Sequence, residues 1–113
     1  MDRDERAEAA RIMLAPADLI APHIVDLEVM QGLRRHGRRG LHDAVRALRQ
    51  FRLLEIRRFD HEPLLPRIWE LRHNLTAYDA AYVALAEAIE APLFTSDRRI
   101  ANAPGHRAEV VVL

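Results

Sequence analysis

A helical segment that leads directly into a buried strand most constrains the fold of this chain. Residues 76–91, TAYDAAYVALAEAIEA, follow a helical pattern that Thr76 opens and Pro92 closes. The next residues, LFTS, form an apolar run typical of a strand covered on both faces. A helix that returns the chain to such a strand is the repeating unit of an α/β sheet. We therefore expect an α/β fold.

The rest of the chain alternates in the same way. Apolar periodicity predicts helices over 4–15, 24–33, 41–51 and 65–75, the last beginning near Pro63 or Pro66, and a helical turn over 97–103. Strands are expected at 18–22, 53–59, 93–96 and 108–113. The order predicts a parallel sheet flanked by helices, and the 113 residues provide one core, so residues 1–113 are expected to form a single domain.

Composition narrows the class of protein. The chain has no cysteine, which excludes disulfides, thiolate metal sites and a cysteine nucleophile. It has no apolar stretch of membrane-spanning length, and it begins MDRDERAEAA, which is charged where a signal peptide is apolar. A cytoplasmic protein is expected. The net charge is zero, so any attraction to nucleic acid must come from local charge.

Three acidic residues are the candidates for a functional site. Glu28, Asp79 and Asp97 each follow a short apolar run or open a helix, so the fold can gather them at the carboxyl edge of one sheet. Clustered carboxylates repel one another unless a cation joins them, and oxygen ligands suit Mg²⁺ or Mn²⁺. The chemistry that follows is hydrolysis of a phosphodiester by metal-activated water.

Each acid alone also has an ordinary structural explanation. Asp79 lies three residues after Thr76, as in a capping box, and Asp97 can cap the helical turn that follows it. Most helical glutamates, like Glu28, are exposed. Thr95 favours a site, because it lies two residues before Asp97 in an extended strand and its side chain points the same way.

Other polar groups are less informative. The arginine-rich turn, residues 34–39, suits RNA phosphates or an acidic partner segment, and it equally suits a solvated helix end. The six histidines lack the spacing of a zinc-binding helix, and one serine makes a serine nucleophile improbable.

Three segments together resemble the PIN-domain ribonucleases, specifically the VapC toxins of toxin–antitoxin pairs: APHIVDLEVMQGLRR, LTAYDAAYVALAEAIEAPLFTSDRRI and the closing VVVL. The resemblance implies a type II toxin that cleaves RNA with Mg²⁺ or Mn²⁺, a VapB-like antitoxin and a homodimer. It assigns Asp79 as main metal ligand, Asp97 as second ligand or water-positioner, and Glu28 as ligand or base. Thr95 matches the family's hydroxyl position.

The chain departs from the family pattern at its start. Family members begin with a strand that ends in aspartate, and neither Asp2 nor Asp4 follows an apolar strand here. The PIN-like fold is therefore expected to lack its N-terminal strand, a central position of the sheet is expected to be open, and the chain to have little or no nuclease activity. An upstream start, a degraded toxin and a strand from another chain all remain open. The alternative function is an inactive remnant that only binds an antitoxin, while the predicted strands argue against an arginine-rich helical regulator.

Overall fold

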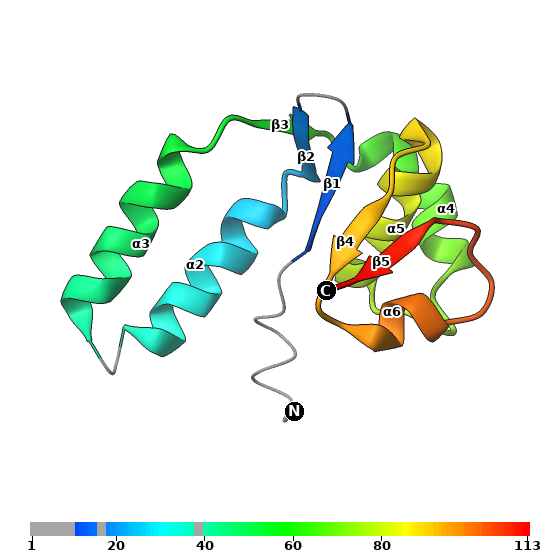
Figure 1. Ribbon diagram of the computed structural model, residues 1–113. Helices are drawn as coiled ribbons and strands as arrows, with labels where there is room; N and C mark the ends of the chain where they lie inside the picture. The colour runs from blue at the N-terminus through cyan, green and yellow to red at the C-terminus, as the bar shows by residue number, and fades with distance from the viewer. Residues whose placement is uncertain (1–10, 16–17, 38–39) are drawn as a thin grey trace.

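A computed structural model describes residues 11–15, 18–37 and 40–113 of the chain, and a five-stranded sheet is its centre (Figure 1). The strand order is β3-β2-β1-β4-β5. The strands are β1 (Arg11–Ala15), β2 (Asp18–Pro22), β3 (Ile56–Phe59), β4 (Leu93–Thr95) and β5 (Val110–Val112). The helices are α2 (Val25–His36), α3 (Leu41–Leu53), the 3₁₀ turn η1 (Glu62–Leu64), α4 (Leu65–Glu70), α5 (Ala77–Ile89) and α6 (Arg98–Asn102).

The sheet is mostly parallel, with one reversed strand. β2 pairs in parallel with β3, and β4 pairs in parallel with β5. β1 runs antiparallel to both of its neighbours, β2 and β4. Because both neighbours oppose β1, the other four strands share one direction. The predicted α/β fold with a parallel sheet and flanking helices is confirmed, with β1 as the exception.

Helix α5 forms much of the core. It packs against β2 and β4, and α4 packs on it in turn. Every residue from Ala80 to Glu87 is buried, which the small alanine side chains allow because they bring the helix close to the sheet. Met13 and Leu93 are fully buried in the central strands. The α2–α3 hairpin extends to the other side, away from α4, α5 and α6 (Figure 1).

The expected helix over residues 4–15 is wrong for its last five residues. Arg11–Ala15 form β1, and residues 4–10 lie outside the described ranges. The sheet position that was expected to be open is therefore filled. The facing strands β2 and β4 both carry backbone donors and acceptors that need partners in the interior, and that requirement outweighs the helical spacing of a short apolar segment.

The other predicted elements are confirmed with shifted ends. The helix expected over 65–75 is shorter, since α4 ends at Glu70 and η1 precedes it. The remaining helices and the strands at 18–22, 53–59, 93–96 and 108–113 occur where the sequence predicted them, within a few residues.

Candidate functional site at the carboxyl edge of the sheet

Glu28, Asp79 and Asp97 all belong to elements that begin at one edge of the sheet. Asp97 lies two residues after the end of β4, and Glu28 lies in the first turn of α2, just after β2. Helix α5 leads back to the start of β4, so its own first turn, with Asp79, lies at the opposite end, beside Asp97. This is the edge at which parallel α/β sheets build their sites.

Asp97 is buried and fully hydrogen-bonded. Its Oδ1 accepts from the backbone N–H of Arg99 at 3.0 Å, which makes Asp97 the N-cap of α6. The guanidinium of Arg99 also donates to both carboxylate oxygens, at 2.6 and 3.1 Å. This hydrogen bonding lowers the pKa of Asp97 although burial opposes it. Fully buried Thr95 accepts from the Asp97 N–H at 3.0 Å, so its hydroxyl positions the residue.

Asp79 is held by one backbone contact and one side-chain contact. Its backbone N–H donates to the Thr76 hydroxyl at 3.1 Å, as in a capping box. Its carboxylate is turned inward, with a side-chain exposure of 15%, and forms an ion pair with Arg11. Thr76 is therefore the residue that caps α5, while the Asp79 carboxylate pairs with Arg11 at the sheet edge.

Glu28 reaches the same interior through Tyr82. Tyr82 is fully buried on α5, one helical turn after Asp79. Burial and a hydrogen bond with Glu28 raise the pKa of Tyr82 far above its usual value. The Glu28 carboxylate consequently joins α2 to α5 rather than lying free on the helix surface.

Arg11 is the residue of this edge that the sequence did not reveal. Its guanidinium pairs with Asp79, lies 5.3 Å from the centre of the Tyr82 ring, and its charge contributes to the low pKa of Asp97. The side chain is only 6% exposed, and its Nε is buried without a hydrogen-bond partner. A buried arginine is rare unless acids surround it.

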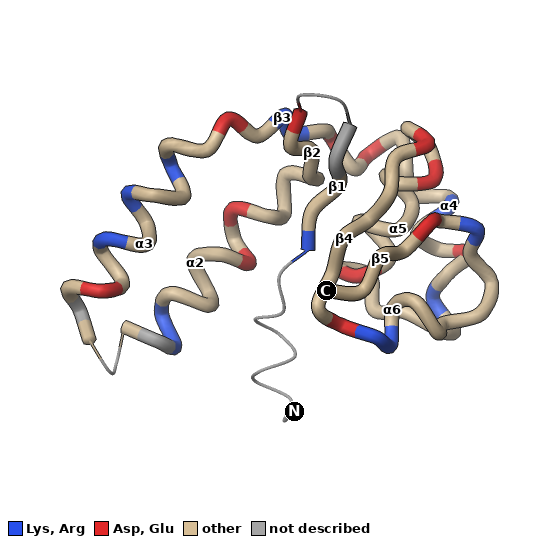
Figure 2. Tube along the Cα trace, in the orientation of Figure 1, with Lys and Arg blue, Asp and Glu red and all other residues tan. Residues whose placement is uncertain are grey.

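The direction of β1 explains how Arg11 arrives there. In the antiparallel register Arg11 faces Thr95, the last residue of β4. A parallel strand would bring its last residue to this edge, whereas β1 brings its first. Figure 2 shows the basic start of β1 beside the end of β4. This placement was not predicted, because the helical spacing of the segment indicated a helix instead of a strand.

The arrangement does not fit a bound metal ion as it stands. Carboxylate and hydroxyl oxygens are suitable ligands for Mg²⁺ or Mn²⁺. Within the described ranges, however, no three His, Asp or Glu side chains lie close enough to hold an ion. The Arg11 guanidinium instead supplies the positive charge beside Asp79.

Two cavities flank the acids. One, of about 340 Å³, is lined by residues that include Thr76, Asp79 and Arg99. The other, of about 370 Å³, is lined by Ile24, Leu27, Glu28, Gln31 and Tyr78. Both open at the carboxyl edge, so a ligand in either lies beside an acid of the site.

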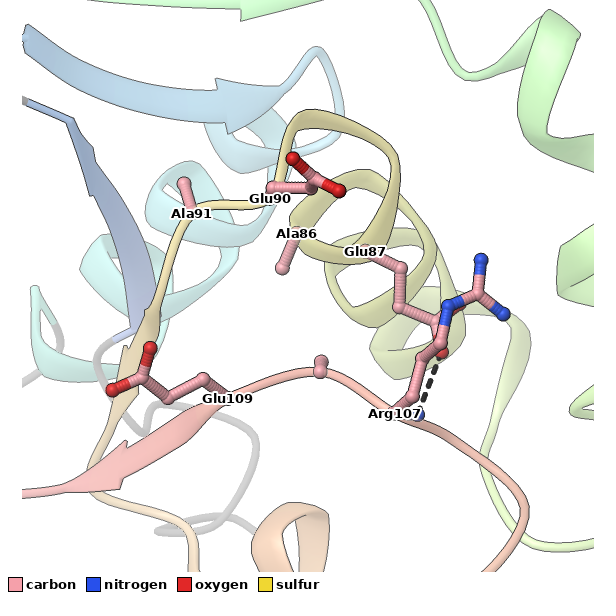
Figure 3. Close-up of a pocket in the computed structure, with 7 residues that line it drawn as sticks. Ala86, Glu87, Glu90, Ala91, Arg107 and Glu109 are labelled. Carbon is pink, nitrogen blue, oxygen red and sulfur yellow. Dashed lines mark hydrogen bonds between the residues drawn. The ribbon is translucent and has the colours of Figure 1, made fainter.

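A third cavity, of about 360 Å³, lies at the far end of α5 (Figure 3). Its Glu87 accepts two hydrogen bonds from Arg67, at 2.8 and 2.9 Å, and one from the Arg107 backbone N–H at 2.8 Å. Hydrogen bonding by Arg67 is the main cause of the lowered pKa of Glu87. This ion pair ties α4 and the approach to β5 onto α5, so it is structural.

The known proteins that are similar to this chain are named as ribonucleases. The PIN domain family matches residues 1–105. "Ribonuclease VapC9" of Mycobacterium tuberculosis (strain ATCC 25618 / H37Rv) is 43% identical over 107 residues, which cover 92% of this chain and 84% of that protein. "Ribonuclease VapC1" of the same strain is 45% identical over 94 residues, covering 80% and 71%. "Ribonuclease VapC3" of Pyrobaculum aerophilum is 36% identical over 109 residues, covering 88% and 82%.

No solved structure matches the chain. Among the helices of the described ranges, none has the length and apolar character needed to cross a membrane.

Proposed function

The chain belongs to the PIN-domain family, and from this premise we propose that it is a metal-dependent endoribonuclease, the toxin of a type II toxin–antitoxin pair. The observation that carries the proposal is the common placement of Glu28, Asp79 and Asp97 at one sheet edge, in a chain 43% identical to a VapC ribonuclease. Its substrate is RNA, and the reaction is hydrolysis of a phosphodiester bond.

Each site residue has a proposed role. Asp79 is the main metal ligand, Asp97 a second ligand or water-positioner, and Glu28 a ligand or the base that holds the attacking water. The Thr95 hydroxyl fixes Asp97 through the hydrogen bond to its N–H. The cofactor is Mg²⁺ or Mn²⁺, which when bound lowers the pKa of water and neutralises phosphate charge. Binding requires that Arg11 leave Asp79, and direct ligation by Asp97 requires that Arg99 release one of its oxygens.

The partners follow from the same premise. We expect a VapB-like antitoxin, a homodimer and a cytoplasmic location. The arginine-rich turn at residues 34–39 is the candidate contact for antitoxin or RNA. Of this turn, the structure describes residues 34–37, which lie at the end of α2 and the tip of the α2–α3 hairpin (Figure 2).

The second candidate function is an inactive PIN protein that binds an antitoxin without cleaving RNA. The observation that favours it is the ion pair of Arg11 with Asp79, because it occupies the carboxylate that a metal needs. The two candidates predict opposite results in a cleavage assay.

The test is cleavage of single-stranded RNA with Mg²⁺ or Mn²⁺ by the wild-type chain and by Asp79→Asn. The substitution keeps the shape of the side chain and removes the charge that the cation needs. A matched control is Glu55→Gln, an exposed acid in the turn between α3 and β3. The proposal requires metal-dependent cleavage that Asp79→Asn abolishes and Glu55→Gln preserves. Cleavage that survives Asp79→Asn rejects the site, and no cleavage by the wild type favours the inactive protein.

A further inference from the structure

We propose that Tyr78 and the cavity it lines form a nucleobase subsite, which seats one unstacked base of a single-stranded RNA beside the acidic edge. The inference rests on the proposed ribonuclease function and adds to it the part of the substrate that the protein recognises.

Tyr78 is an exposed aromatic residue at the start of a helix whose middle is buried. Its side chain is 60% exposed, although the residues from Ala80 to Glu87 on the same helix are all buried. It directly precedes Asp79, in the first turn of α5. The core therefore does not explain the large aromatic side chain at this position.

The cavity beside Tyr78 has the size and lining of a small-ligand site. Its volume of about 370 Å³ is at the lower end of the range of roughly 300–1,000 Å³ for such sites. Ile24 and Leu27 contribute aliphatic side chains to the lining, and Leu27 is 66% exposed. Isolated exposed apolar residues need no explanation, but here two exposed residues, Leu27 and Tyr78, border the same cavity.

The lining matches the chemistry of a base better than that of a phosphate. An aromatic face and aliphatic side chains stack against a flat, neutral ring. Gln31 offers an amide that both donates and accepts, which suits the hydrogen-bonding edge of a base. Glu28 would repel a phosphate at this position, whereas a neutral base avoids the repulsion.

The position of the cavity selects RNA as the occupant. Glu28 lines it, and Tyr78 directly precedes Asp79, so the cavity borders the proposed site. Sequence-specific recognition of RNA commonly uses unstacked bases held on aromatic side chains. A base held between Tyr78 and Leu27 would fix which nucleotide lies next to Asp79.

The experiment measures binding of a fluorescent single-stranded RNA dodecamer by anisotropy at low salt. EDTA is present so that no metal-dependent cleavage occurs. Tyr78→Ala should weaken binding roughly five- to 150-fold, the range expected when one stacked base loses its aromatic partner. Tyr78→Phe keeps the ring and should bind within about twofold of the wild type. The matched control is Trp69→Ala on α4, a second exposed aromatic whose ring is stacked by Arg72 at 4.2 Å.

A scan with abasic nucleotides identifies the base. One abasic position should weaken binding to the wild type about as much as Tyr78→Ala does, and should have little further effect on Tyr78→Ala, since the two losses remove the same contact. Circular dichroism melting of each variant confirms folding.

Three outcomes would overturn the subsite. They are wild-type binding too weak to measure, a Tyr78→Ala affinity equal to that of Trp69→Ala, and a flat abasic scan. Unchanged RNA binding together with loss of a protein partner would assign the cavity to that partner instead. A Tyr78-dependent base contact without Asp79-dependent cleavage would keep the subsite and reject the nuclease.

Discussion

Replacing Arg11 with methionine would show whether a built-in cation holds the acidic edge together. Methionine keeps most of the aliphatic volume in the core and removes only the charge and its donors. The loss leaves the buried Asp97 and the 15%-exposed Asp79 with Arg99 as their remaining positive neighbour. Removing one partner of a buried pair costs about 3–5 kcal/mol, and the partial exposure of Asp79 reduces this to about 2–4 kcal/mol.

The cost translates into a melting temperature. An unfolding entropy of about 2.1 cal/mol/K per residue gives roughly 240 cal/mol/K for 113 residues. The loss of about 2–4 kcal/mol should therefore lower Tm by roughly 8–17 °C. A typical domain is stable by about 5–15 kcal/mol, so the variant should still fold at 25 °C.

Mn²⁺ should then replace the missing charge. At 100 times its dissociation constant, an ion that binds only the folded chain adds about 2.7 kcal/mol, which corresponds to roughly 11 °C. We expect a saturable rise in Tm of this order for Arg11→Met and a much smaller rise for the wild type, where the guanidinium competes. The measurement is thermal unfolding followed by circular dichroism at increasing Mn²⁺.

Two further variants make the result specific. Arg57→Met removes an exposed arginine on β3 whose ion pair with Asp18 is 3.7 Å long, so Tm should change by less than about 4 °C, with no new response to Mn²⁺. Arg11→Met combined with Asp79→Asn should lose the response. A wild-type Tm in Arg11→Met would refute the buried counter-cation, and a lowered Tm without rescue by Mn²⁺ would refute the cation site.

Three other predictions concern the rest of the molecule. Glu87→Gln should lower the free energy of unfolding by about 1–3 kcal/mol near pH 7. Because the fold depresses the pKa of Glu87, the stability that its charge contributes is present above the unfolded pKa of about 4.3 and is lost as pH falls through the folded pKa. The Tm difference between the variant and the wild type should therefore vanish in acid. Replacing Arg35 and Arg38 with alanine should weaken antitoxin or RNA binding and reduce its salt dependence without changing Tm, and an unchanged salt slope would assign the cluster to solvation. The variant Ile12→Cys/Phe94→Cys should form a disulfide in this cysteine-free chain, because these residues are paired in the antiparallel register of β1 and β4, and failure to cross-link would contradict that register.

Most elements of the fold were predictable because their signals are local. The helix α5 is bounded by Thr76, which caps it, and by Pro92, and its long apolar pattern has one explanation. The strand at 93–96 and the short helix capped by Asp97 were also predicted from adjacent residues alone. Even the common edge of the three acids followed from the order of helices and strands, since that order fixes which ends of the elements meet.

The features that were missed depend on partners distant in sequence. The segment Arg11–Ala15 contains both helical spacing and a strand-like apolar run, and only the unsatisfied edges of β2 and β4 decide between them. The ion pair of Arg11 with Asp79 joins residues 68 positions apart. A sequence pattern carries no information about such a pair until the strand that brings Arg11 to the edge has been placed.

The direction of β1 consequently determines the chemistry of the edge more than its presence does. Either direction would satisfy the ladders of β2 and β4, and Met13 would lie at the middle of the strand in both. Reversal exchanges the ends, however, so the edge where the acids gather receives Arg11 in place of the last residue of the strand. A central strand ending in an acid would add negative charge to Asp79 and Asp97 and so favour a cation from solution. A strand beginning with arginine neutralises the same carboxylates from within, and metal binding at this edge must then compete with an intramolecular guanidinium.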